Sequence, residues 1–63
     1  MKYRHYKGGI YEFICEARLE SAPDVAVIIY KSEDGAFWSR PKNEFFELVL
    51  HEGITIQRFA PIN

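Results

Sequence analysis

The chain has few of the features that a membrane-spanning helix, a metal site or a disulfide framework requires. It contains one cysteine, three prolines and four glycines in 63 residues, and no hydrophobic run long enough to form a spanning helix. Cys15 has no partner for an internal disulfide, and no Cys/His cluster has the spacing of a metal site. We therefore expect no metal, no other cofactor and no membrane partner. The absence of an apolar leader segment predicts a cytoplasmic location.

What the chain does contain predicts one small domain over residues 1–63. So short a chain buries about 60% of its unfolded surface, so its core must be thin or rich in aromatic residues. Ten aromatic residues and 48% hydrophobic content argue against disorder. The net charge of −1 argues against electrostatic binding of DNA by the whole chain. Residues 1–11 are basic and residues 12–39 are acidic, which suits a local anion contact or self-association, unless these charges only solvate the surface.

Hydrophobic periodicity predicts five strands. Residues 10–20 alternate with period two, which indicates a half-buried strand with one wet face. Cys15 lies on the apolar side of that alternation, so we expect it to be buried and slow to react with thiol reagents. Residues 25–30 form a continuous apolar run, typical of a central strand, after a break at residues 21–24 around Pro23. Shorter strands are predicted at 36–40, 46–50 and 54–59.

Two glycine-containing turns predict hairpins and fix which side chains face each other. A three-residue loop, Glu33-Asp34-Gly35, with Gly35 in the left-handed conformation, would set Tyr30 opposite Trp38 and Ile28 opposite Arg40. The same loop length at His51-Glu52-Gly53 would pair apolar with apolar side chains, with Leu48 opposite Ile56 and Leu50 opposite Ile54. A two-residue loop there would instead set Leu48 against Gln57.

The predicted fold class is all-β and mainly antiparallel. Pro41 ends the third predicted strand, and residues 41–45 form either one helical turn or an irregular loop. Five short strands with hairpins suggest a small, partly open barrel of SH3-like type. The alternative is an open five-stranded sheet that needs a second copy to cover one face.

Aromatic and basic residues are interleaved at two places, which marks the candidate site. Rings beside cations are what stacking on bases or cation–π binding requires. Arg40 follows Trp38 on one strand face and could lie along its indole, with Arg4 and His5 on the opposite lip of a groove. The same aromatics could instead serve only the core, with the arginine covering the tryptophan. The candidate ligand-binding residues are Arg4, His5, Tyr6, Tyr30, Trp38 and Arg40.

The evidence for catalysis is weak. Gly8-Gly9 lacks the helix and the Lys-Ser/Thr of a phosphate-binding loop. Cys15 could pair with His5 or His51 as a nucleophile, but a cysteine on an apolar strand face is usually inert. We therefore expect no catalytic residues and no enzyme.

Several of these residues occur together in a known family. Tyr3-Arg4-His5-Tyr6-Lys7-Gly8, Trp38-Ser39-Arg40-Pro41, Gly53 and Arg58-Phe59 resemble the small bacterial family catalogued as domain of unknown function 1653. The resemblance covers nearly the whole chain and implies a bacterial domain without an established activity, cofactor or substrate. Many members carry a histidine two positions after the alanine that corresponds to Ala17, where this chain has Leu19.

Two functional hypotheses follow from the sequence. The first is a binding module whose aromatic and arginine surface takes a nucleotide, single-stranded nucleic acid or a peptide. The second is a structural or interaction protein that forms a homodimer or docks onto a larger partner, without ligand chemistry. The sequence does not identify the partner.

Overall fold

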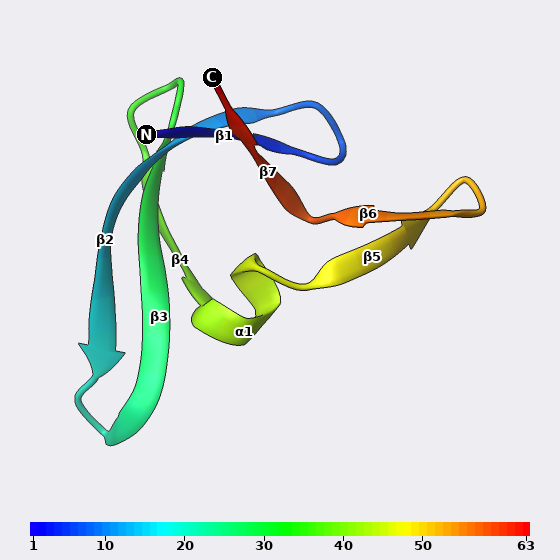
Figure 1. The fold of residues 1–63 in the computed structure, drawn as a ribbon. Helices are drawn as coiled ribbons and strands as arrows, with labels where there is room; N and C mark the ends of the chain where they lie inside the picture. Colours follow the sequence, from blue (N-terminus) through cyan, green and yellow to red (C-terminus); the bar gives the residue numbers. More distant parts are fainter.

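The computed structural model describes residues 1–63 as seven strands and one short helix (Figure 1). In chain order the elements are β1 (Lys2–His5), β2 (Ile10–Leu19), β3 (Ala22–Ser32), β4 (Phe37–Pro41), α1 (Lys42–Phe45), β5 (Leu48–His51), β6 (Ile54–Gln57) and β7 (Phe59–Ile62). The all-β class and the helical turn after Pro41 are confirmed. No helix is long and apolar enough to cross a membrane.

The strands form two separate antiparallel sheets that do not close into a barrel. The larger sheet has the order β4-β3-β2-β1-β7, and β5 pairs only with β6. The expected five-stranded barrel is thus replaced by an open five-stranded sheet with a two-stranded arm, β5–β6 (Figure 1). Two strands were missed, β1 and β7. They are four residues each and pair with each other from opposite ends of the chain, so neither has the length or periodicity that identifies a strand locally.

The β3–β4 hairpin has the predicted register. Ile28 lies opposite Arg40, Ile29 opposite Ser39 and Tyr30 opposite Trp38. The turn residue Gly35 has φ +90°. Glycine adopts this conformation at the lowest cost because it has no Cβ atom. The backbone N–H of Gly35 donates to the carbonyl of Ser32 at 2.9 Å and closes the turn. The three-residue loop ending in Gly35 therefore predicted the register of this hairpin correctly.

The register predicted for the β5–β6 arm was wrong by one residue. Leu48 lies opposite Gln57, Val49 opposite Ile56 and Leu50 opposite Thr55, across a two-residue Glu52-Gly53 loop. Both loop residues have positive φ, 53° and 78°, which is the requirement of a type I′ turn. The twist of that turn suits the flanking strands. The rule that apolar residues face apolar residues failed here, because Leu48 and Leu50 are exposed and gain little from such pairing.

Cys15 was predicted to be buried, and this was also wrong. The pairing of β2 with β3 shifts between Phe13 and Cys15, so Ile14 is an extra residue in the ladder. Such a bulge reverses the alternation beyond it. Phe13 therefore pairs with Tyr30 on the core side, whereas Cys15 pairs with Ile29 on the other side and is exposed.

Pro23 was expected to break the chain between strands, but it lies inside β3. The break is a tighter turn at Glu20 and Ser21, and Ala22 already pairs with Leu19. A second register shift separates this pair from the pairing of Arg18 with Ala26. Pro23 falls in that irregular stretch, where the missing N–H costs no ladder hydrogen bond.

The core lies on the concave side of the large sheet, where α1 and the edge strand β7 meet the middle of β3. Its buried residues are Ile28, Tyr30, Phe45 and Phe59. The rings of Phe45 and Phe59 stack with centroids 4.2 Å apart and planes at 6°. The remaining rings of the cluster meet edge to face or tilted, the arrangement that aromatic quadrupoles favour. This small aromatic core positions every residue of the site described next.

Candidate functional site

Three basic side chains gather at the rim of the aromatic core: His5, Arg40 and Arg58. We call them the arginine–histidine cluster. They come from three separate parts of the chain, namely the end of β1, the end of β4 and the link between β6 and β7. Phe59 connects them, because its ring contacts the His5 imidazole at 4.8 Å between centroids and lies 5.9 Å from the Arg40 guanidinium carbon.

His5 is held in a defined orientation by the strand and by the loop that follows. Its backbone pairs with that of Phe59 across β1 and β7, which turns the imidazole toward the core. The backbone N–H of Lys7 donates to His5 Nδ1 at 3.1 Å. Because Nδ1 accepts this bond, the neutral ring carries its proton on Nε2 and can donate from there.

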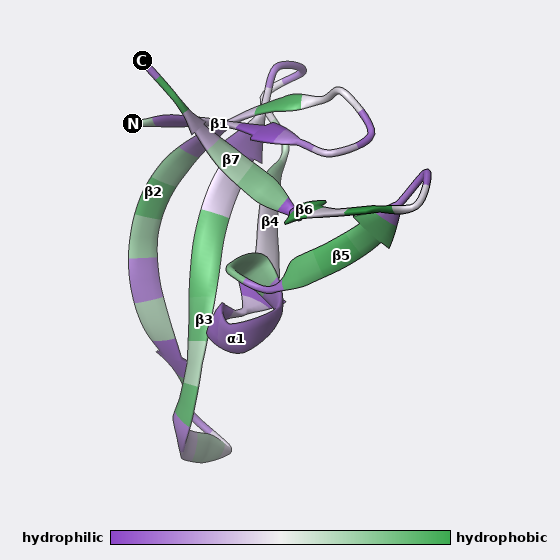
Figure 2. Cartoon of the chain, turned by 45° about the vertical axis from the view of Figure 1, so that its right-hand side comes forward, coloured by the Kyte–Doolittle hydropathy of each residue, from purple (hydrophilic) through white to green (hydrophobic).

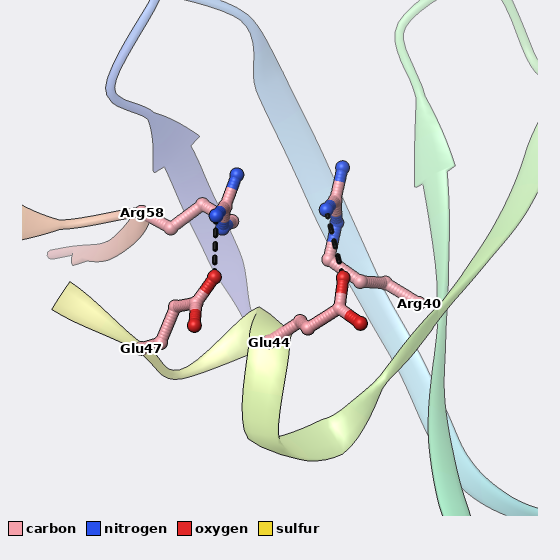
Figure 3. A network of polar contacts seen from close by, with 4 residues as sticks. All are labelled: Arg40, Glu44, Glu47 and Arg58. Atoms are coloured by element: carbon pink, nitrogen blue, oxygen red, sulfur yellow. Dashed lines mark hydrogen bonds and ion pairs between the residues drawn. The ribbon is translucent and has the colours of Figure 1, made fainter. Parts of the chain in front are cut away.

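Arg40 is anchored by the turn that follows β4. The Pro41-led helix α1 places Glu44 one turn further on, and the Glu44 carboxylate lies 3.6 Å from Arg40 Nη1 (Figure 3). The side chain is 30% exposed, so the guanidinium sits at the rim of the core rather than in bulk solvent.

Arg58 is anchored in the same manner from the other side. Its Nη2 donates to the carboxylate of Glu47, and its backbone N–H donates to the Glu47 carbonyl at 3.0 Å. In the view of Figure 3 each guanidinium group lies above the glutamate that it contacts. The Nε atoms of both arginines are buried and donate no hydrogen bond. Each glutamate thus orients one arginine while leaving other guanidinium N–H groups to bind an acceptor.

The two arginines lie near enough to His5 to influence its titration. Burial first, and then the charges of Arg40, Arg58 and Lys7, hold the pKa of His5 below its ordinary value of 6.5. His5 is therefore neutral at pH 7, and the two arginines carry the positive charge of the cluster. An anion placed among them would meet two guanidinium groups and an imidazole N–H.

The structure brings together only part of the set predicted from sequence. His5 and Arg40 join the cluster, and Tyr6 packs on His5 at 4.6 Å between ring centroids. Tyr30 lies beneath the cluster as a buried core ring, 6% exposed, that packs against Phe45 and Phe59. The structure gives Tyr30 a packing role and leaves Tyr6 at the surface.

Arg4 does not lie opposite Arg40, which corrects the expected two-lipped groove. Tyr3 and His5 face the core, so alternation along β1 turns Arg4 to the other face, opposite Ile10 and Ala60. Arg4 instead lines a groove of about 520 Å³ between β1 and the β5–β6 arm, together with His5, Tyr6, Leu48 and Gln57, and neither Arg40 nor Arg58 lines this groove.

Trp38 keeps its predicted place beside Tyr30 but not its predicted contact with Arg40. The indole N–H donates to the hydroxyl of Ser32 at 3.0 Å, and the ring is 51% exposed. The Arg40 guanidinium lies over Phe59 instead of the indole. The deeper aromatic offers Arg40 a less hydrated site, and the indole leans toward Ser32 with about half of the residue's surface exposed.

Arg58 is the site residue that sequence reasoning missed. It was noted only as part of an Arg-Phe pair in the family resemblance. Its closeness to His5 depends on the pairing of β7 with β1, in which the Tyr6 N–H donates to the Arg58 carbonyl at 2.9 Å. No local pattern predicts a contact between residues so far apart in the chain.

Two further groupings bear on chemistry. Cys15 and His5 lie on opposite faces of the large sheet, so they do not form the nucleophile–base pair considered above. No three His, Cys, Asp or Glu side chains come together in the arrangement of a metal site.

The family resemblance is confirmed by comparison with known proteins. Residues 1–61 match the family described as protein of unknown function, DUF1653. The chain belongs to this family. No curated protein and no solved structure matches it.

Proposed function

We propose that this protein is a binding module, not an enzyme, and that its ligand is a nucleotide or a short single strand of nucleic acid. The observation that supports the proposal is the arginine–histidine cluster together with the half-exposed Trp38, two residues from Arg40 along β4. Two oriented guanidinium groups suit a phosphate, which accepts paired N–H bonds. The neutral His5 Nε2–H adds a third donor at the same point.

The spacing to Trp38 favours a nucleotide over a simple anion. Trp38 and Arg40 are two residues apart on one strand face, about 6.6 Å along the strand. A base stacked on the indole would hold its phosphate near Arg40 and Arg58. Base stacking of this kind tolerates any base, because every base has a π-face. A peptide ligand has a weaker case, since the groove that would suit it lies on the Arg4 side, away from both arginines.

A titration followed by Trp38 fluorescence tests the proposal. The probes are inorganic phosphate, a nucleoside, nucleoside mono- and diphosphates, and short single-stranded DNA and RNA. We expect quenching by the nucleotides and single strands, with affinity falling as salt rises. The nucleoside and inorganic phosphate should each bind far more weakly. The nucleoside can only stack on the indole, and inorganic phosphate can only bind the arginines.

Two matched variants make the test specific to the site. Arg58→Gln removes a cluster charge and should weaken nucleotide binding by about 10-fold to 100-fold, the value of charged hydrogen bonds. Arg18→Gln removes the same kind of side chain at the far end of the β2–β3 hairpin, where its guanidinium bonds only the Pro23 carbonyl. Equal binding by both variants, or no fluorescence response to any probe, would contradict the proposal.

A further inference from the structure

The outer edge of β6 is open and borders the groove that Arg4 lines. β6 pairs only with β5, so no strand lies beside its other edge (Figure 1). The volume of about 520 Å³ falls within the roughly 300–1,000 Å³ of ordinary ligand sites. Part of the lining comes from the β1–β2 hairpin, and part from three consecutive residues of β6, Thr55, Ile56 and Gln57. Because neighbouring strand residues point to opposite faces, three in a row indicate that the backbone of β6 itself borders the groove.

Half of the backbone polar groups of β6 point away from β5. The two-residue turn makes the pair next to it, His51 and Ile54, hydrogen-bonded, and bonded and non-bonded pairs then alternate along the hairpin. Ile54 and Ile56 therefore bond to β5, whereas the N–H and C=O groups of Thr55 and Gln57 point to the open edge. No turn or loop hydrogen bond uses these four groups. The edge thus presents two donors and two acceptors in the pattern of an unpaired strand.

The side chains around the groove divide into an apolar and a basic part. Leu48, which is 61% exposed, lines the groove together with Ile56 and Ala60. Arg4 lines it from β1, and the exposed Lys7 follows in the loop after β1. No acidic residue lines the groove, and neither of these two cations forms an ion pair. Figure 2 shows the same division, with hydrophilic colouring on β1 and hydrophobic colouring on β5.

These features together fit one kind of partner. An extended peptide satisfies the free backbone groups of a strand edge by adding one more strand to the sheet. Cations without acidic partners favour carboxylates on that peptide. A small anion would leave the edge unpaired, and a proline-rich segment would lack the N–H groups that an added strand must donate.

We propose that the groove between β6 and the β1–β2 hairpin binds an extended acidic segment of a partner protein. The segment pairs with the backbone of Thr55 and Gln57 and places a carboxylate against Arg4. This interaction goes beyond the proposed nucleotide site, because neither arginine of the arginine–histidine cluster lines the groove.

Hydrogen exchange of single amides, followed by NMR, tests the proposal. The probe is a capped hexapeptide in which valine and glutamate alternate. At saturating peptide, the amides of Thr55 and Gln57 should exchange about three-fold to ten-fold more slowly, the value of one new hydrogen bond each. The amides of Ile54 and Ile56 should change little, because they already bond to β5. This alternation distinguishes an added strand from a contact through side chains alone.

Three matched probes separate the contributions of backbone and charge. The lysine analogue of the hexapeptide should bind about ten-fold or more weakly, because its charges meet Arg4 and Lys7. The glutamate hexapeptide N-methylated at alternate residues should also bind weakly in the register that faces β6. N-acetylglutamate amide, which has the carboxylate but no strand, should bind far more weakly than the hexapeptide. Equal binding of N-acetylglutamate amide and the hexapeptide would contradict strand addition.

Arg4→Gln should weaken binding of the glutamate hexapeptide by about ten-fold, the value of a charged hydrogen bond. Arg18→Gln is the matched control, because Arg18 lies on β2 and bonds only the Pro23 carbonyl. Both arginines are exposed, so both variants should fold. Unchanged exchange at Thr55 and Gln57 up to about 1 mM hexapeptide, or equal binding by the two variants, overturns the proposal. Protection of the same amides in the protein alone, rising with protein concentration, would assign the edge to a second copy and also overturn it.

Discussion

Two hairpins of this protein, β3–β4 and the β5–β6 arm, are built from similar residues but are stabilised by different forces. The β3–β4 hairpin has a three-residue turn with one left-handed residue, and its inner side rests on the aromatic core. The β5–β6 arm has a two-residue turn with two left-handed residues, and Leu48, Leu50 and Ile54 on it are exposed. Packing therefore stabilises the first hairpin, whereas the turn backbone dominates the second.

The largest test of this contrast removes an apolar side chain from each hairpin. Ile28→Ala should lower the free energy of unfolding by about 2–5 kcal/mol, because Ile28 is 1% exposed and its loss leaves a cavity. Leu50→Ala should change it by no more than about 0.5 kcal/mol. Urea unfolding followed by circular dichroism measures both.

A chain of this size has roughly 3–9 kcal/mol of stability in total, so Ile28→Ala could leave too little to fold. Ile28→Val, expected to cost about 0.5–1.5 kcal/mol, then supplies the measurement. A loss from Leu50→Ala as large as that from the Ile28 variants would show that the arm is packed in solution.

A smaller effect is expected at Trp38, on the exposed edge of the packed hairpin. Trp38→Ala should cost about 1–2 kcal/mol, because the ring is 51% exposed and donates one hydrogen bond to Ser32. A fully buried aromatic would cost about 3–5 kcal/mol. Calorimetric titration of the variant with a nucleoside diphosphate should also show lost binding, which Trp38→Phe partly retains. A loss of stability as large as that of a core aromatic, with binding intact, would assign Trp38 to the core.

The pH dependence tests the place where the arm meets the end of β1. Tyr6 contacts His5 on one side and His51 of the arm on the other, with ring centroids 4.6 and 5.3 Å apart. The pKa of His5 is lowered in the folded state, so the unfolded chain binds more protons below pH 6.5. The free energy of unfolding should therefore fall as pH drops from about 7 through 6.5 toward the folded pKa of His5.

Unfolding curves for the wild type and His5→Gln check this expectation. The variant should lose most of the dependence between about pH 7 and pH 5. The lowered pKa values of Glu12 and Asp34 act at more acidic pH, because both are carboxylates. A pH dependence that survives His5→Gln would place its origin elsewhere, with His51 the next residue to replace.

The smallest effect is expected in the turn of the arm. Glu52 adopts φ 53°, which a non-glycine residue with a long side chain rarely does. Glu52→Asn should stabilise the protein by about 0.4–1 kcal/mol, because asparagine tolerates this conformation in type I′ turns. A thermal unfolding series with Glu33→Asn, in the other turn, is the control and should shift little. No gain from Glu52→Asn would indicate that the arm unfolds before the rest of the protein.

The sequence predicted a strand register correctly where the turn residues and the burial of core side chains required the same register. At the β3–β4 hairpin the position of Gly35 and the burial of Tyr30 required the same register, and the prediction succeeded. At the arm, the rule that apolar residues pair together assumed a buried face, and the two positive φ angles decided otherwise. The bulge at Ile14 left no trace in the alternation of β2, so Cys15 was placed on the wrong side.

The candidate site was predictable only in part for a related reason. His5 and Arg40 could be singled out because each lies beside aromatic residues in the chain. Arg58 joins them through the pairing of β1 with β7, which brings together residues separated by almost the whole sequence. Local composition identifies which residue types a site uses, while long-range strand pairing decides which individual residues of those types come together.

The same pairing has a consequence for the connectivity of the molecule. Because Lys2 lies opposite Ile62, the two termini leave the sheet close together, at the end remote from the Glu20–Ser21 turn (Figure 1). A short linker could join them into a closed ring, with new termini opened in the exposed Glu52–Gly53 turn. Such a circular permutant would keep every strand pair of the large sheet. A protein fused to either natural end would project from the same edge of the sheet.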